Sequence, residues 1–373
     1  MSETGDAKVQ PVAVGEIVDR KSKIVDADPG TSIPAPVSPY TLVLTHDVDH
    51  LCMRRIRPFS RRHLALVKDL VARNFVRLVF GRISLADYAA SLELALELPL
   101  VMLGLVPDPW EESIEAITRL EEEFGFRSTF FFMPFADEAG HTPAGLPAPV
   151  HRASNYRLAD YRNLLGSLVE RGWEVGLHGI DCHTGEAAAR REKAELARVL
   201  GAQPAGCRMH WLYSTERLNQ HLKDAGFAYN ATLGYNDRVG FPDGRARPYV
   251  EMESGLAILP LAIQDCALLR ADHANLAPQA AWDRISRILE SARASGAVVT
   301  VLWHNDSFVP PRCWHRLYRR LLEQARADNA CVVRSMDVVN ELGGGPALHV
   351  PVLLRRPERP TRTVTVSVYA TSG

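Results

Sequence analysis

The chain has 373 residues, of which 46% are hydrophobic and 23% charged, and its formal net charge is −1. These values are typical of a globular protein and exclude a disordered or fibrous chain, and the near-zero charge gives no general attraction to nucleic acid. The six cysteines form no C-x-x-C pair, which argues against a disulfide scaffold and a structural zinc knuckle and suits a reducing compartment.

Residues 1–38 are rich in Pro, Gly, Ser and small polar residues, which predicts a flexible leader. They contain no apolar segment of a secretory signal, and the longest apolar stretch, 98–107, is too short to span a bilayer. From these features we expect a cytoplasmic protein, with the inner membrane surface as an alternative location.

From residue 39 onward, β-rich runs alternate with helical periods. We predict strands at 41–45, 127–134, 173–178, 205–211, 227–235, 298–304 and 330–335, and helices at 114–125, 156–172, 185–201, 214–226, 281–296 and 313–329. This alternation indicates parallel βα units, arranged as a sheet or a barrel, in one domain at 39–342. Residues 343–373, with four glycines, four prolines and a basic run, are predicted to be a C-terminal tail.

An insertion at about 50–110 separates the first predicted strand from the first predicted helix. Residues 51–82 contain nine Lys or Arg against one acid, Asp69, and the apolar residues Leu64, Val67, Leu70, Val71 and Phe75 fall roughly on one helical face. Such a basic amphipathic segment can contact an anionic membrane surface or guide an anionic substrate. The interpretation that we favour is a solvated cap over the barrel mouth, because runs of charged residues usually face water; the sequence alone does not decide between the two.

Ionisable residues gather where four of the predicted strands end. The carboxyl ends of parallel strands meet on one face of the fold, so these residues are expected to lie together. An Asp with two His can hold a divalent cation and leave positions open for water and substrate. The set comprises His46, Asp47, Asp49, His178, Asp181, His183, Arg208, His210, His304 and Asp306.

Several of these motifs resemble those of the polysaccharide deacetylases, the family 4 carbohydrate esterases, over roughly residues 41–340 without the insertion. Thr45-His46-Asp47-Val48-Asp49 is similar to the family's first motif, Thr-Phe-Asp-Asp-Gly, with one residue added between the carboxylates. RSTFFF (127–132) is similar to the family's second strand, where Phe130 and Phe132 are expected in the core. The resemblance implies a distorted (β/α) barrel, with Asp47 as general base and Asp49 as a metal ligand.

The second motif of the family has two histidines four residues apart, whereas His178 and His183 are five apart here. We therefore predict His178 and His183 as metal ligands, with Asp181 or a water as the alternative to His183.

The remaining motifs supply the other site residues. In CRMHWL (207–212), Arg208 matches the family's Arg and Trp211 matches the family's aromatic residue, whereas His210 stands in place of the family's Pro. The resemblance implies that Arg208 orients Asp47. His210 is expected to touch substrate or merely to pack. Leu302-Trp303-His304 fits the last motif, which implies His304 as general acid and Leu302 as a wall of the acetyl pocket. The family's Asp that tunes this His has no clear counterpart; Asp237 is the nearest candidate.

The resemblance thus implies a metal-dependent hydrolase that removes an N-acetyl group from a sugar, glycan or glycolipid. The expected cofactor is a divalent metal, Zn first and Co, Mn or Ni as alternatives. Two other functions stay open: a catalytically silent carbohydrate-binding relative, and a metal-dependent amidase with a non-sugar substrate. No nucleic-acid partner is expected, since no binding module is recognisable and the basic segment lacks interleaved aromatic residues.

Overall fold

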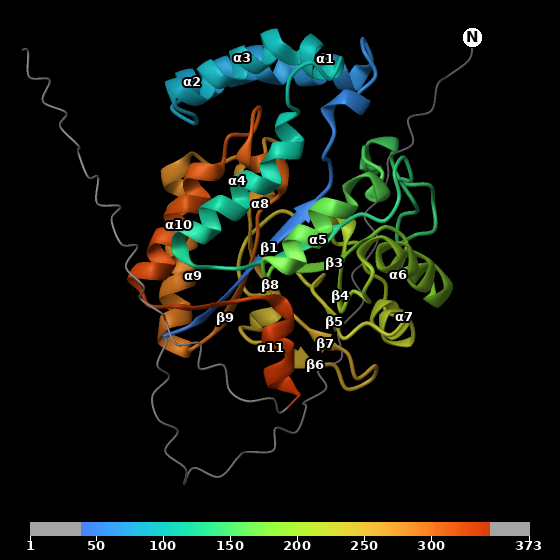
Figure 1. The fold of residues 1–373 in the computed structure, drawn as a ribbon. Helices are drawn as coiled ribbons and strands as arrows, with labels where there is room; N and C mark the ends of the chain where they lie inside the picture. Colours follow the sequence, from blue (N-terminus) through green and yellow to red (C-terminus); the bar gives the residue numbers. More distant parts are fainter. Residues whose placement is uncertain (1–38, 344–373) are drawn as a thin grey trace, which may run out of the picture. The chain divides into compact units, whose positions relative to one another are not determined.

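The computed structural model describes residues 39–343 (Figure 1). The predicted leader at 1–38 and the predicted tail beyond residue 343 lie outside the described residues. None of the described helices has the length and apolar composition that crossing a membrane requires.

The described residues form one ten-stranded sheet with the order β6-β7-β5-β4-β3-β2-β1-β9-β8, and β10 also pairs with β1. Every pairing is parallel except that between β6 and β7. The strands are β1 (Thr41–Val48), β2 (Thr129–Phe132), β3 (Glu174–Gly179), β4 (Gly206–Met209), β5 (Tyr229–Asn230), β6 (Tyr249–Val250), β7 (Ala257–Ile258), β8 (Leu261–Gln264), β9 (Val298–Leu302) and β10 (Cys331–Val333).

The sheet curls into a barrel that is closed irregularly between β5 and β8. The predicted strand at 227–235 ends at Asn230, and the chain beyond it makes isolated backbone bonds instead of a ladder. The N–H of Leu261 donates to the carbonyl of Leu233 at 2.7 Å, and the N–H of Gly240 donates to the carbonyl of Ala262 at 2.8 Å. These bonds link the edge strand β8 to the chain that follows β5, and the predicted distorted (β/α) barrel is confirmed.

The predicted helices are present as α4 (Pro109–Phe124), α5 (Arg162–Glu170), α6 (Glu186–Leu200), α7 (Leu218–Asp224), α9 (Pro278–Ser295) and α10 (His315–Ala327). α4 begins with Asp108 as N-cap and ends at Gly125, whose φ of 74° lies in the left-handed region that glycine adopts without a steric penalty. Two short helices, α8 (Asp265–Leu269) and α11 (Ser335–Leu342), were not predicted from the sequence.

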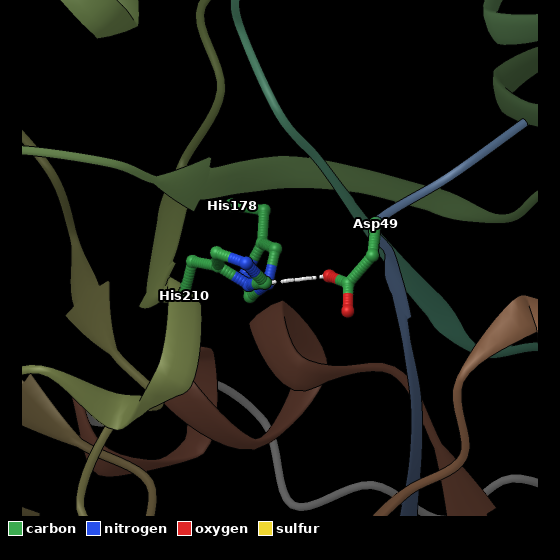
Figure 2. Close-up of side chains that lie close together, drawn as sticks. All are labelled: Asp49, His178 and His210. Carbon is green, nitrogen blue, oxygen red and sulfur yellow. Dashed lines mark hydrogen bonds and ion pairs between the residues drawn. The ribbon is translucent and has the colours of Figure 1, made fainter. Parts of the chain in front are cut away.

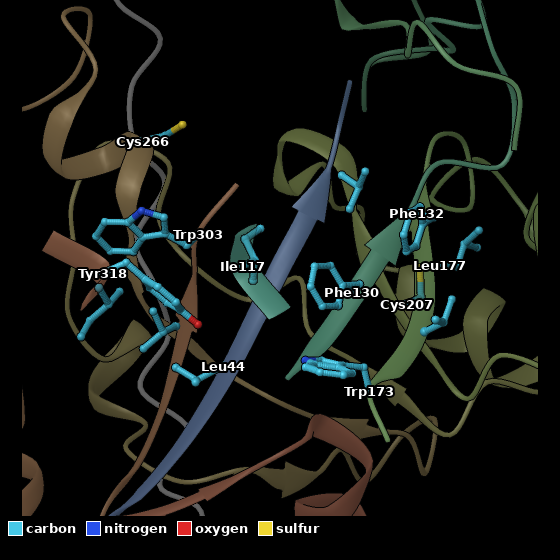
Figure 3. Close-up of a cluster of buried hydrophobic side chains, with 14 of the residues drawn as sticks. Leu44, Ile117, Phe130, Phe132, Trp173, Leu177, Cys207, Cys266, Trp303 and Tyr318 are labelled. Carbon is cyan, nitrogen blue, oxygen red and sulfur yellow. The ribbon is translucent and has the colours of Figure 1, made fainter. Parts of the chain in front are cut away.

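The main hydrophobic core lies between the strands and the surrounding helices (Figure 3). Phe130 and Phe132 are fully buried, as predicted, and pack with Ile117 of α4. His46, which alternates with Asp47 along β1, points into this core rather than into the site: its Nε2 lies 2.9 Å from Oε1 of the buried Glu121. This alternation, which sends successive side chains of a strand to opposite faces, separates a structural histidine from the functional carboxylate beside it.

The insertion is helical, as predicted, and has a core of its own. It comprises α1 (Arg61–Lys68), a π-helical turn (Asp69–Arg73), α2 (Asn74–Val79) and α3 (Leu85–Met102). Leu66 and Leu70 pack against Leu94, Leu98 and neighbouring residues in this second cluster. The insertion follows the carboxyl end of β1, and Figure 1 shows α1–α3 as a layer at that end of the barrel.

Candidate active site

The carboxyl ends of β1, β3, β4 and β9 bring together the side chains that the sequence singles out. Asp47 and His178 are the last but one residues of β1 and β3, Asp49 directly follows β1, and His210 and His304 follow β4 and β9. With Leu302 and Trp211 they line a single pocket, which encloses about 460 Å³ including the space at its open mouth. This is the size range of small-molecule sites, so the barrel gathers its polar groups where a substrate can reach them.

Three potential metal ligands converge in this pocket: Asp49, His178 and His210 (Figure 2). Asp49 Oδ1 lies 3.2 Å from His178 Nε2 and 3.2 Å from His210 Nδ1, and the two nitrogens lie 2.9 Å apart. A cation with bonds of about 2.0–2.2 Å separates ligand atoms on one of its faces by roughly 3 to 3.5 Å. The three atoms therefore have the spacing that a shared cation requires.

The outer hydrogen bonds of both histidines fix which nitrogen faces the pocket with a lone pair. His178 Nδ1 donates to the carbonyl of Arg208 at 3.0 Å, and His210 Nε2 donates to the carbonyl of Arg152 at 3.0 Å. Because a carbonyl oxygen only accepts, His178 Nε2 and His210 Nδ1 carry lone pairs in the neutral rings.

Two lone pairs and a carboxylate oxygen thus point at one another in a buried site, which is unfavourable unless a positive charge lies between them. Burial lowers the pKa of His210, so its ring is neutral at pH 7 despite the opposing effect of Asp49. The three side chains therefore fit a divalent cation.

His183 is not in this cluster, so the predicted ligand set needs a correction. Its ring packs edge-on against Tyr213 with a centroid distance of 5.8 Å, beside the backbone of Thr142. The cause is the loop after β3: Glu192 of α6 accepts the N–H groups of Ile180 and Asp181 at 2.7 and 2.6 Å and so fixes the turn.

Asp181, the alternative third ligand, is also outside the cluster. Its carboxylate accepts the backbone N–H of His141 at 2.7 Å and lies 2.9 Å from the Nδ1 of that residue. His210, expected to touch substrate or to pack, takes the third position instead.

The backbone after β4 explains how His210 reaches the pocket. Trp211 and Leu212 both adopt left-handed conformations, with φ of 59° and 53°, at a cost of about 1–2 kcal/mol for each non-glycine residue. Arg152 holds the turn by donating to the carbonyl of His210 at 3.0 Å, while its own carbonyl accepts from the ring. Arg152 belongs to no motif recognised in the sequence, so its role was not predicted.

Asp47 and Arg208 form the buried pair that the resemblance implies. Arg208 Nη1 lies 3.1 Å from Asp47 Oδ1, and the guanidinium also donates to Thr45 Oγ1 at 2.6 Å and to the carbonyl of Ala231 at 3.0 Å. The second oxygen of Asp47 lies 3.7 Å from His178 Nε2. Arg208 thus fixes one carboxylate oxygen and leaves the other facing the candidate metal ligands.

His304 has a carboxylate partner that was not predicted from the sequence. Asp265, at the end of β8, accepts from the backbone N–H of His304 at 2.9 Å and lies 2.7 Å from its Nδ1. Burial lowers the pKa of His304, but Asp265 and the Cys266 thiol outweigh it and hold that pKa well above its usual value. Burial raises the pKa of Asp265, yet His304 brings it down to about 2.

Asp237, the predicted tuning residue, does not hold this histidine: its side chain is 69% exposed and pairs with Arg238. The sequence does contain a pattern that points to Asp265. Like β1, the apolar strand LAIQ is followed by a carboxylate, and this pattern could have identified Asp265 as a site residue.

Comparisons with known proteins give matches only among solved structures. No protein-family model matches the chain, and no curated protein sequence matches it. A Mycobacterium smegmatis protein assigned as a polysaccharide deacetylase aligns over 86% of this chain and 96% of its own, with a TM-score of 0.51 and 17% identity.

Two further structures align over most of both chains. The PuuE allantoinase aligns over 84% of this chain and 95% of its own, with a TM-score of 0.51 and 12% identity. A Pseudomonas aeruginosa PAO1 protein assigned as a polysaccharide deacetylase aligns over 81% and 90%, with a TM-score of 0.50 and 12% identity. With identities of 12–17%, these similarities show that the chain shares the fold of these three proteins.

Proposed function

We propose that the protein is a metal-dependent hydrolase that removes an N-acetyl group from a sugar or glycoconjugate. The observation that carries this proposal is the arrangement of the pocket. A three-ligand cluster lies between a carboxylate held by an arginine, Asp47 with Arg208, and an imidazole held by a carboxylate, His304 with Asp265. The fold shared with proteins assigned as polysaccharide deacetylases supports the same reaction.

The proposed cofactor is a divalent cation on Asp49, His178 and His210, with Zn²⁺ as first choice and Co²⁺, Mn²⁺ or Ni²⁺ as alternatives. When bound, such an ion polarises an acyl carbonyl and lowers the pKa of water. Two imidazoles and one carboxylate are ligands that suit these ions.

Asp47 is the proposed general base. Its Oδ1 is engaged by Arg208, so the free Oδ2 is the atom that accepts a proton from the attacking water. The resulting hydroxide attacks the carbonyl carbon of the acetyl group. Leu302, which is buried and lines the pocket, supplies an apolar surface for the acetyl methyl group.

His304 is the proposed general acid. Its Nδ1 is held by Asp265, so Nε2 points to the pocket, where it lies 3.8 Å from Asp49 Oδ2. A pKa raised above its usual value keeps the ring protonated near neutral pH, the state in which Nε2 gives its proton to the departing nitrogen. The backbone N–H groups around Trp211, which also lines the pocket, are the candidates for stabilising the developing oxyanion.

A second candidate function is the hydrolysis of a cyclic or linear amide that is not part of a sugar. The fold similarity to an allantoinase, which is as great as that to the Mycobacterium smegmatis protein, favours it. Both functions use the same base, acid and ligands, so only the substrate separates them.

The experiment is a comparison of acetate release from N-acetylated sugars with hydrolysis of non-sugar amides, using protein reconstituted with Zn²⁺ and checked for metal content. We expect acetate release that falls about a hundredfold or more in Asp47→Asn and in His304→Ala, with His183→Gln as the matched histidine control. Turnover of non-sugar amides alone would establish the second function. Glycan binding without turnover of any amide would show a catalytically silent relative and refute the proposal.

A further inference from the structure

The helical insertion exposes an unusual amount of apolar surface. Twelve of the eighteen large hydrophobic side chains that are exposed among residues 39–343 lie between Phe59 and Leu105. They include Phe59, Phe80 and Leu96, which are 85%, 71% and 82% exposed. Single exposed apolar residues are normal, but their concentration on one layer marks an interaction surface.

α3 shows this most clearly, because it is apolar on two opposite sides. Leu94, Leu98 and Val101 are buried in the core of the insertion. Leu85, Leu96, Leu100 and Leu103 follow one another at spacings of eleven, four and three residues, which places them on one helical face, and all four are exposed. A surface helix normally has a polar outer face, so the second apolar face of α3 indicates that it binds a partner.

The contacts between the insertion and the barrel show that the exposed faces point away from the barrel. Asn74 and Arg77 of α2 donate to the carbonyl of Pro311, and Asp87 of α3 accepts from Arg316 at 3.1 Å. The exposed leucines of α3 lie roughly half a turn from Asp87. Val71 of the π-helical turn and Phe75 and Val79 of α2 are also exposed and recur at spacings of four residues.

The charge of the same segment indicates the chemistry of the partner. Residues 51–105 contain nine Lys or Arg against four Asp or Glu. Within the described part of the chain, Arg57, Arg61 and Lys68 form no ion pair with a carboxylate. On and just before α1, the exposed Phe59 and Leu64 stand among these unpaired basic residues, which is the pattern of helices that lie in the interface of an anionic bilayer. α3 has no Lys or Arg and exposes Glu93 and Glu97, so its part in the proposed surface is the apolar contact of its outer leucines. A second copy of the chain is disfavoured, because two basic layers would repel each other.

We propose that the layer α1–α3 docks on the surface of an anionic lipid bilayer, with its outer leucines and phenylalanines among the acyl chains and its arginines and lysines at the headgroups. The proposal holds whether or not the protein is a deacetylase. The layer also contacts the site region: Arg62 Nη2 of α1 lies 2.9 Å from His50 Nε2, next to the candidate ligand Asp49. Docking would therefore bring the pocket beside the headgroups, where a lipid-linked substrate would be found.

The test is flotation of the full-length protein with vesicles of phosphatidylcholine alone and of phosphatidylcholine mixed with phosphatidylglycerol. We expect binding to the mixed vesicles that weakens with added salt. The variant Leu96→Glu/Leu103→Glu should lose at least about tenfold in affinity, and so should Arg61→Glu/Lys68→Glu. All four positions lie on the surface of the insertion, so the fold is retained, which circular dichroism checks.

The matched control is Leu146→Glu/Met252→Glu, which places charges on side chains 64% and 98% exposed outside the layer; it should bind as the unmodified protein does. Equal binding to both kinds of vesicle, or loss of binding in the control as well, would overturn the proposal. So would a dimer in solution, measured by light scattering, that only Leu96→Glu/Leu103→Glu dissociates while vesicles bind none of the proteins.

Discussion

The pairing of His304 with Asp265 can be tested through the substitution Asp265→Asn, which removes one negative charge and keeps the shape of the side chain. Asp265 Oδ1 lies 2.7 Å from His304 Nδ1, and both groups are buried. At that distance two unit charges attract by roughly 6 kcal/mol with an effective dielectric constant of 20. Burial of the ring opposes this attraction, and the net effect is a pKa of His304 well above its usual value.

We therefore expect the pKa of His304 to fall by at least about one unit in Asp265→Asn, which corresponds to about 1.4 kcal/mol. A general acid works only while protonated, so activity is lost as the pH rises through this pKa. In the variant, the alkaline limb of the kcat/KM profile should move to lower pH, and the rate at pH 7 should fall.

The assay combines this pH profile with an NMR titration of the His304 ring in metal-free protein, which needs no activity. Ser307→Ala is the matched control, because it removes a hydrogen bond to Asp265 Oδ2 without removing the charge. If the ring titrates at the same pH in Asp265→Asn as in the unmodified protein, the reasoning about this pair is wrong.

Three further predictions follow from the site and its surroundings. His210→Gln should lower Zn²⁺ affinity by more than about a hundredfold, whereas His183→Gln should leave it unchanged, as measured by competition with a chromogenic chelator; equal losses would contradict the ligand assignment. Asp47→Asn should retain the bound metal, measured by elemental analysis, while losing about a hundredfold or more in rate; loss of the metal would make Asp47 a ligand. Burial raises the pKa of Glu192 to about 7, so the folded state holds this proton longer than the unfolded state, and stability should fall by about 3 kcal/mol between pH 4.5 and 7. Denaturant unfolding at several pH values should show that the free energy of unfolding depends less on pH in Glu192→Gln than in the unmodified protein. An unchanged pH dependence would show that Glu192 is not its origin.

The fold could be predicted from the sequence because strands and helices have different apolar periods and clear ends. Gly125 and Gly201 end their helices in left-handed conformations, as the sequence indicates. The structure between β5 and β8 could not be predicted in the same way. There β5 and β7 are only two residues long, and isolated hydrogen bonds such as Gly240 to Ala262 replace a continuous ladder. Strands that short leave no periodicity to recognise.

The prediction of the site was limited by loop geometry rather than by residue type. His183 has the right chemistry, but the turn fixed by Glu192 directs it to Tyr213. His210 was recognised as unusual, yet its direction depends on the left-handed conformations of Trp211 and Leu212. Such conformations are uncommon in non-glycine residues and are not foreseen from sequence. The meeting of the strand ends can therefore be predicted from the sequence. Which of their side chains point into the pocket depends on contacts between residues distant in sequence, and this cannot be predicted in the same way.

The measurement that tests the central claim most directly is a crystal structure of the protein grown with Zn²⁺, with anomalous data collected on both sides of the zinc absorption edge. The account predicts one strong anomalous peak within about 2.3 Å of Asp49 Oδ1, His178 Nε2 and His210 Nδ1. A fully occupied zinc bound by His183 or Asp181, or an empty pocket in protein that binds zinc elsewhere, would contradict it.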